Sequence, residues 1–388
     1  MGRQEKIARS IVRIIVQPSV NGAQKRSESK NSFALIWTLF SAFFALYQLV
    51  LCKIRPADFS NLRREHWKLS DNDYIDSFQP PHNGEGGKLQ DGLKAIGDMG
   101  FSGSTFYSTR DQKFLVKSIP RHSEHSFFRD DLLTPYVQYM ATNPKSLLVR
   151  ICDFLGPSYA VSLGRILRLA PSHHIVMENI MYGREKAKDS QQEDWEDWDL
   201  KPTSYFYPER DIADGALTSE ATLSQLADEF HDKIILTQQQ ADEFFQLLEK
   251  DTMLLAEQNA VDYSLFLVRI KVAPEQQPVS SSSPADSSMV PTDPPSVPPA
   301  PPSWRTGISS ADGKYIFRAS ILDFFWAKHK LQPKFMTFLI NAWNLLIRKD
   351  GPMSITTTPD EYRERFLKMC RGIVEVQEDE ESGLVESR

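Results

Sequence analysis

Two aspartates each stand alone in a run of large apolar residues. Asp262 lies in AVDYSLFLVRI, and Asp323 lies in SILDFFWAKHK. Apolar runs of this length predict strands that enter a hydrophobic core, so we expect both carboxylates to be buried. A buried carboxylate is costly unless another group pairs with it. A metal ion, or a phosphate-bearing ligand held by a lysine, would offset that cost, and the two aspartates therefore point to phosphoryl transfer.

A candidate phosphate-binding turn lies upstream, in FSGSTFYSTRDQKFLVKSI at residues 101–119. A Gly/Ser turn lets backbone N–H groups approach phosphates closely, and the candidates here are Gly100, Ser102, Gly103 and Ser104. Lys117 follows on the next strand, where a lysine can pair with the α- and β-phosphates, and Glu124 is a candidate ion-pair partner for it. An ordinary turn and a solvated strand lysine explain the same residues, so the sequence leaves both interpretations open.

Two further segments complete the predicted site. HHIVMENIMYG is typical of a strand that runs into a connector, whose backbone at Met177 and Asn179 could meet an adenine ring; a simple buried strand explains it equally well. Its His173 and His174 are expected in a loop rather than as ligands. Lys201, in DLKPTS, is a second positive group for the γ-phosphate. Asp262 would then act as base or orienter of the attacking hydroxyl, and Asp323 would hold magnesium.

Composition limits the class of protein. The chain has 388 residues, enough for one large or two medium domains. Its net charge of −6 argues against a nucleic-acid-binding protein. Its 3 cysteines, Cys52, Cys152 and Cys370, form neither a disulfide framework nor a metal-binding spacing, which favours a reducing compartment.

Residues 33–52, FALIWTLFSAFFALYQLVLC, contain no charged side chain and are long enough to span a bilayer. Polar residues within the run, such as Ser41 and Gln48, favour a buried or interfacial helix instead. Basic residues flank the run on both sides, so their distribution does not indicate which end of a membrane-spanning segment would face the cytoplasm. Transmembrane and peripheral interpretations both stay open.

Several elements carry clear local signals. Isoleucines at helical spacing predict a short basic amphipathic helix within residues 1–30, and residues 57–76 predict a helix, a turn and a second helix. Strands on either side of Arg110 and Asp111 predict a hairpin. The next helix should bury one face, made of Phe128, Leu132, Tyr136 and Met140.

The second half of the chain predicts an acidic loop at residues 188–198 and two capped helices. Thr237 with Gln240 forms one capping box, ahead of an apolar stripe of Ala241, Phe244, Phe245, Leu248 and Leu255. Thr358, Pro359 and Glu361 begin the last helix, which should bury Tyr362, Phe366, Met369 and Ile373. The Pro/Ser-rich insert at residues 273–303 is expected to be disordered. Together these elements predict an α+β protein with two lobes, and a cleft between lobes is a usual place for a nucleotide.

The ordered set of motifs resembles the phosphatidylinositol phosphate kinases between about residues 57 and 374. NPKSLLVRICDFLG is similar to that family's N-P-x-S-L-L-x-R stretch, and VDYSLFLVRI to its M-D-Y-S-L-L-x-G. DLK at 199–201 matches the start of its D-L-K-G-S, and SILDFFWAKHK resembles its I-I-D strand. Three positions depart from the pattern, where the family has glycine and this chain has Pro202, Ser320 and Arg269 or a neighbour of it.

This resemblance implies a two-lobed kinase-like fold with antiparallel sheets, of the kind also found in the SAICAR synthetases. It implies an N-terminal lobe at 57–182 and a catalytic lobe at 183–374. Outside the resemblance, the sequence predicts a basic helix and a hydrophobic segment at 1–56 and an acidic tail at 375–388. The resemblance also implies a lipid kinase that uses ATP and Mg²⁺ on a phosphoinositide at the cytoplasmic face of an anionic membrane. By resemblance, Lys117 is the nucleotide lysine, Lys201 and Asp262 are catalytic, and Asp323 binds the metal. Lys328, Lys330 and Lys334 would belong to the activation loop that meets lipid. The departures leave an inactive pseudokinase, acting as a membrane-associated interaction module, as the alternative.

Overall fold

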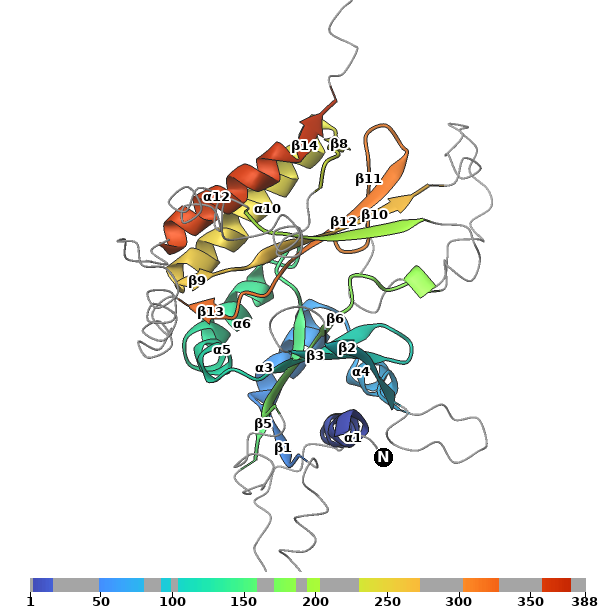
Figure 1. The fold of residues 1–388 in the computed structure, drawn as a ribbon, viewed down its shortest axis with the longest axis vertical. Coiled ribbons are helices and arrows are strands. Elements are labelled where there is room, and N and C mark those ends of the chain that lie inside the picture. Colours follow the sequence, from blue (N-terminus) through green and yellow to red (C-terminus); the bar gives the residue numbers. More distant parts are fainter. Residues whose placement is uncertain are drawn as a thin grey trace, which may run out of the picture. The chain divides into compact units, whose positions relative to one another are not determined.

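The computed structural model describes residues 3–16, 49–79, 92–98, 104–158, 171–185, 194–202, 230–272, 303–327 and 358–377, which form two compact units (Figure 1). The first unit contains the described residues up to His125 together with 150–182. The second contains residues 126–149 and the described residues from Gly183 onward. The two combine helices with mainly antiparallel sheets, so the predicted α+β class is confirmed.

The first unit is built on a six-stranded sheet in the order β1-β5-β6-β4-β3-β2, in which every neighbouring pair is antiparallel. Its strands are β1 (Leu51–Ile54), β2 (Leu93–Asp98), β3 (Thr105–Thr109), β4 (Phe114–Ile119), β5 (Ile151–Pro157) and β6 (His173–Glu178). The predicted hairpin is β3 and β4. Its turn is closed by Asp111, which accepts hydrogen bonds from Thr109 Oγ1 and Lys113 N.

Four short helical segments accompany this sheet. The predicted basic helix is α1 (Arg3–Val16), which packs on β1 and β2 and buries Ile7, Ile11 and Ile15. The predicted pair at 57–76 is α3 (Pro56–Asn61), continued by the π-helical turn η1 (Leu62–His66), and α4 (Asp71–Asp76). The N-terminus of α4 is capped by Ser70, whose hydroxyl accepts from Asp73 N at 3.1 Å.

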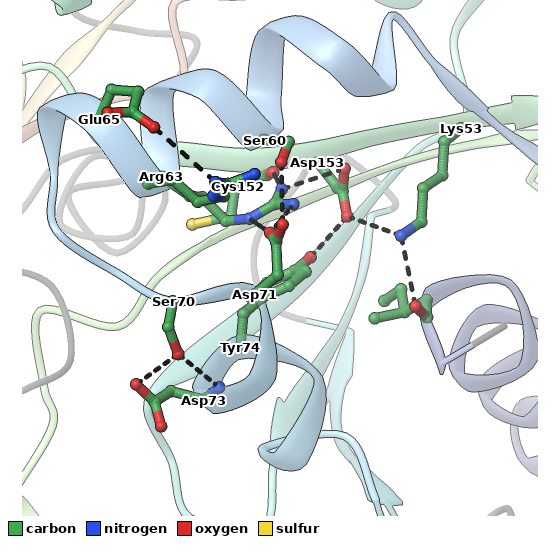
Figure 2. A network of polar contacts seen from close by, with 12 residues as sticks. Lys53, Ser60, Arg63, Glu65, Ser70, Asp71, Asp73, Tyr74, Cys152 and Asp153 are labelled. Carbon is green, nitrogen blue, oxygen red and sulfur yellow. Dashed lines mark hydrogen bonds and ion pairs between the residues drawn. The ribbon is translucent and has the colours of Figure 1, made fainter. Parts of the chain in front are cut away.

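A buried polar network joins these helices to the sheet (Figure 2). Asp153 of β5 is 1% exposed, and it lies 3.4 Å from Arg63 Nη1 and 3.6 Å from Lys53 Nζ. Tyr74 OH donates a hydrogen bond to Asp153 Oδ2, the oxygen that also faces Lys53, at 2.9 Å. Burial opposes the charge of Arg63, but the neighbouring Asp153 carboxylate raises the pKa of Arg63 above its usual value. The network therefore fixes β1, η1 and α4 around one buried carboxylate.

The second unit contains a four-stranded antiparallel sheet in the order β11-β12-β10-β7 (Figure 1). Its strands are β7 (Trp195–Leu200), β10 (Ser264–Lys271), β11 (Ile308–Ser309) and β12 (Tyr315–Leu322). Two small ladders accompany it: β9 (Ala260–Val261) with β13 (Trp326–Ala327), and the parallel pair β8 (Ile234–Leu236) with β14 (Val374–Val376). The parallel pair is an exception to the predicted antiparallel sheets.

The helices of this unit follow their local signals. The predicted helix around Tyr136 is η3 (Phe128–Leu132) and α6 (Leu133–Thr142), and it follows α5 (His122–Phe127). The capping box of Thr237 and Gln240 is present at α10 (Gln238–Glu257). Thr358 accepts from Glu361 N at the start of α12 (Pro359–Gly372), which packs against α10. Phe245 and Met369 were expected to be buried, but they are only half-buried because they lie at the edges of the buried helix faces.

Other predictions need correction. His173 and His174 are not in a loop: both are buried in β6, between β4 and β5. The acidic segment 188–198 is not a loop throughout, because its end from Trp195 belongs to β7, where it pairs with β10. Residues 273–302 and the tail from 378 lie outside the described residues, so their predicted disorder is untested.

The uncharged run 33–52 is only partly described. Leu51 and Cys52 are residues of β1, paired with Pro157 and Gly156, so the end of the run is strand rather than helix. Residues 33–48 lie outside the described residues. Within the part of the chain that is described, no helix has the length and apolar character needed to span a bilayer.

Candidate active site

In the sheet of the second unit, β7 and β12 end, and β10 between them begins, on the same side of the sheet. We call this side, where the strand ends meet, the sheet edge. Lys201 directly follows β7, Asp262 lies two residues before β10, and Asp323 directly follows β12. Because β10 is antiparallel to both neighbours, its start meets both of their ends. The registers Leu265↔Leu200 and Ser264↔Leu322 show this alignment. Residues far apart in the sequence are therefore brought to one place by strand pairing.

Each aspartate interrupts a strand at an equivalent position: Asp262 lies between β9 and β10, and Asp323 lies between β12 and β13. Both have left-handed φ angles, 64° at Asp262 and 62° at Asp323. They lie where the β10–β12 ladder gives way to the β9–β13 ladder, between the pairs Ser264↔Leu322 and Val261↔Trp326. A left-handed non-glycine residue is unfavourable and persists where its surroundings enforce it, often at functional sites.

The expectation that both carboxylates are buried was wrong. The Asp262 side chain is 29% exposed, and Asp323 is also half-exposed. Because the strands are interrupted at these two positions, both side chains lie outside the buried strands that the apolar runs predicted. The neighbours stay in the core: Tyr263, Phe324 and Phe325 are buried. Tyr362 OH donates to Tyr263 O at 2.5 Å, so α12 holds the backbone next to Asp262.

Lys201 and Asp262 form an ion pair, with Nζ and Oδ1 3.0 Å apart. The Lys201 side chain is 16% exposed. Burial by itself would lower the pKa of Lys201, but the carboxylates of Asp262 and Asp323 raise it above its usual value. Lys201 is therefore a firmly protonated cation placed among acidic groups.

Asp199 is a member of this cluster that the sequence analysis did not single out. It lies in β7 opposite Phe266 of β10, and its charge also raises the pKa of Lys201. The signal was available, because Asp199 is the first residue of the DLK motif. Its position two residues before Lys201 brings a third carboxylate to the lysine.

The donor set suits a hard divalent cation. Mg²⁺ binds oxygen ligands, and proteins usually offer it one or two carboxylates while phosphates and water complete the shell. Asp323, at the same edge as Asp262, provides that kind of donor. The described residues contain no group of three His, Cys, Asp or Glu side chains that could hold a metal ion by themselves. The chemistry of the site thus fits a metal ion shared with a phosphate ligand.

The predicted nucleotide residues that are described belong to the first unit, whereas Lys201, Asp262 and Asp323 belong to the second. Lys117 of β4 is 6% exposed, and its Nζ lies 5.4 Å from the centre of the Phe106 ring. Ser104, directly before β3, is buried. Glu124 opens α5 and forms an ion pair with Arg121 at 3.0 Å.

The predicted hinge residues have structural partners. Met177 of β6 is 5% exposed, between Leu115 and Ile151 of the neighbouring strands. Asn179 donates from its backbone to Lys113 O at 3.0 Å and from its side chain to Gln112 O at 2.7 Å. Asn179 therefore ties the end of β6 to the β3–β4 hairpin.

Six of the predicted site residues cannot be placed. Gly100, Ser102 and Gly103 of the candidate phosphate turn lie outside the described residues, and so do Lys328, Lys330 and Lys334 of the candidate lipid loop.

Two departures from the family pattern have a structural role. Ser320 is fully buried, and its hydroxyl donates to Leu147 O at 2.9 Å. Arg269 pairs with Glu196 at 2.7 Å and with Asp232 at 2.5 Å, and its guanidinium lies 4.8 Å from the centre of the Tyr315 ring. Pro202, next to Lys201, is buried and offers no N–H.

The family model described as Phosphatidylinositol-4-phosphate 5-Kinase matches residues 88–373. The chain belongs to this family. A phosphatidylinositol 4-phosphate 5-kinase of Plasmodium falciparum is 25% identical over 334 residues, which cover 83% of this chain and 18% of that protein. The phosphatidylinositol 4-phosphate 5-kinase-like protein 1 of Mus musculus is 29% identical over 177 residues, 45% of this chain and 40% of that protein. The chain thus spans less than half the length of these relatives.

Proposed function

We propose that this chain is a lipid kinase that transfers the γ-phosphoryl group of Mg-ATP to an inositol-ring hydroxyl of a phosphatidylinositol phosphate. Membership of the phosphatidylinositol-4-phosphate 5-kinase family supports the reaction class. The observation that carries the proposal is the meeting of Lys201, Asp262 and Asp323 at one sheet edge. Phosphoryl transfer depends mainly on positioning and on charge stabilisation, and this arrangement offers both.

Each residue has a role that its geometry favours. Asp262 is half-exposed, so an attacking hydroxyl can reach its carboxylate and give up a proton to it. Lys201 is held 3.0 Å from that carboxylate and stays protonated, so it orients Asp262 and offers positive charge to the transferring group. Asp323 supplies oxygen ligands for magnesium, which would neutralise phosphate charge when bound.

Family membership supports the choice of the remaining partners. In this proposal Lys117 contacts nucleotide phosphates, and the lysines after Asp323 contact the lipid. In this proposal the reaction takes place at the cytoplasmic face of an anionic membrane, where the lipid substrate would lie. The candidate phosphate turn, Gly100 to Ser104, would hold the phosphates through its backbone N–H groups.

A second candidate is a pseudokinase that keeps the fold as an interaction module. Pro202 favours it, because a proline beside Lys201 fixes the local backbone and removes a donor that a glycine would offer.

One experiment separates the two. The thermal midpoint of the full chain is measured with ATP, with and without Mg²⁺, and [γ-³²P]ATP is then supplied with vesicles of each phosphatidylinositol phosphate. A Mg²⁺-dependent rise in midpoint and a labelled lipid are the expected results. Stabilisation without labelled lipid would favour a nucleotide-binding module, and no stabilisation would favour the pseudokinase.

A further inference from the structure

The two elements that flank residues 17–48 are joined to each other in the first unit. The Ser10 hydroxyl of α1 accepts a hydrogen bond from Leu49 N at 3.1 Å. Lys53 Nζ of β1 donates to Ile15 O, near the end of α1, at 3.3 Å. The place where the chain leaves α1 therefore lies beside the place where it re-enters the unit.

Both flanking elements are firmly held. In β1, Lys53 also pairs with the buried Asp153 (Figure 2). Directly before β1, Val50 O accepts a hydrogen bond from Ser158 N at 2.9 Å. In α1, Ile7, Ile11 and Ile15 are at most 3% exposed. Separating α1 from β1 would expose this apolar face and break the contacts between them.

The uncharged run is also shorter than the sequence suggested, because its last residues belong to the folded unit. Leu49 is bonded to α1, and Leu51 and Cys52 are in β1. Residues 33–48 are then the part of this run that is left to enter a membrane. A helix of that length would measure about 24 Å, whereas the hydrocarbon core of a bilayer is about 30 Å thick.

The side of α1 away from its apolar face is basic. Arg3 and Arg13 are exposed, and Lys6 and Arg9 are half-exposed. Glu5 is the acidic side chain exposed on this helix, so the basic side chains outnumber it four to one. A basic helix face is complementary to anionic lipid head groups, each basic residue adding to the attraction.

We propose that the first unit meets an anionic bilayer from one side, through the basic face of α1, with both ends of residues 17–48 on that same side. This inference rests on the proposed function for the choice of an anionic membrane as partner. It also replaces the transmembrane interpretation of 33–52, because a single crossing would put α1 and β1 on opposite sides of the bilayer.

The topology is tested with the full chain carrying one epitope tag at each end. Cells that express it are broken, and sealed membrane vesicles with the cytoplasmic side outward are treated with protease. We expect both tags to be digested without detergent. An N-terminal tag that survives until detergent is added, while the C-terminal tag is digested, would overturn the proposal.

The docking face is tested by sedimentation with phosphatidylcholine vesicles that contain phosphatidylserine. Arg9→Glu/Arg13→Glu should lower the partition coefficient at least tenfold. The matched control, Lys368→Glu/Arg371→Glu, reverses two charges exposed on α12 and should bind like the wild type. Equal loss in both double variants, or no loss in either, would contradict the proposal.

Thermal midpoints and circular dichroism check that each variant is folded. Neither assay measures phosphoryl transfer, so failure of this inference is distinguishable from failure of the proposed function. An inactive protein would pass both tests if its membrane face is assigned correctly.

Discussion

The Lys201 ammonium lies 3.0 Å from the Asp262 carboxylate, although 61 residues separate them in the sequence. This ion pair is enforced by the antiparallel register of β7 and β10, which aligns Leu200 with Leu265. The ion pair fixes the position of the lysine, and Asp323 also lies close enough to raise the pKa of Lys201. The predictions on catalysis below depend on this arrangement.

Asp262→Asn should abolish most turnover and keep nucleotide binding. The amide has the shape of the carboxylate but cannot take a proton, and loss of a general base typically lowers rates by about 10²–10⁴-fold. The measurement is kcat for lipid phosphorylation, together with the ATP-induced thermal shift. Asp242→Asn, on the exposed side of α10, is the matched control and should leave both unchanged. Wild-type turnover in Asp262→Asn would remove Asp262 from the mechanism.

Asp323→Asn should remove the magnesium dependence of ATP binding. An amide is a much weaker ligand for a hard divalent cation than a carboxylate is. Titration of ATP in Mg²⁺ and in EDTA should then give the same affinity for the variant, whereas the wild type binds more tightly with Mg²⁺. A variant that keeps the full Mg²⁺ effect would show that the metal ligand lies elsewhere.

Asp251 should make the second unit more stable at low pH. The carboxylate is fully buried in α10, where it accepts from Tyr139 OH at 2.6 Å and from Leu147 N at 2.6 Å. Burial raises the pKa of Asp251 to about 6, above the usual 3.8, although its hydrogen bonds oppose the shift.

The sign follows from the pKa difference. The folded state binds the Asp251 proton more tightly than the unfolded state does, so this contribution to stability is complete below pH 3.8 and is lost as pH rises through about 6. The slope is at most about 1.4 kcal/mol per pH unit. Urea unfolding between these values should show it in the wild type, and the slope should be smaller in Asp251→Asn. Identical pH profiles would contradict the assignment.

Asp153→Asn should destabilise the first unit strongly. The change leaves Arg63 and Lys53 close together without the buried carboxylate that pairs with both (Figure 2). Breaking a buried ion pair typically costs about 3–5 kcal/mol. Asp71→Asn is the matched control, because Asp71 pairs with the same Arg63 but its side chain is 36% exposed. Chemical denaturation should give a clearly smaller loss for Asp71→Asn, and equal losses would show that burial of Asp153 is not decisive.

Local chemistry made much of the fold predictable. The caps at Thr237 and Thr358 and the β3–β4 hairpin depend on residues a few positions apart, and each formed where its pattern indicated. His173 and His174 were misplaced because a polar pair before an apolar run looks like a loop, whereas both histidines are buried between neighbouring strands. Asp199 was overlooked although it begins the DLK motif, because the motif by itself does not show that this carboxylate acts on Lys201.

The sequence by itself determined the strands next to Asp262 and Asp323 and the helix caps, because hydrophobic runs and caps act over a few residues. Only the tertiary structure decided that both aspartates leave their strands in a left-handed conformation and share one edge with Lys201. That outcome depends on the registers among β7, β10 and β12, set by contacts between residues tens of positions apart. Such contacts form only when the whole core is assembled, so no local pattern in the chain contains them.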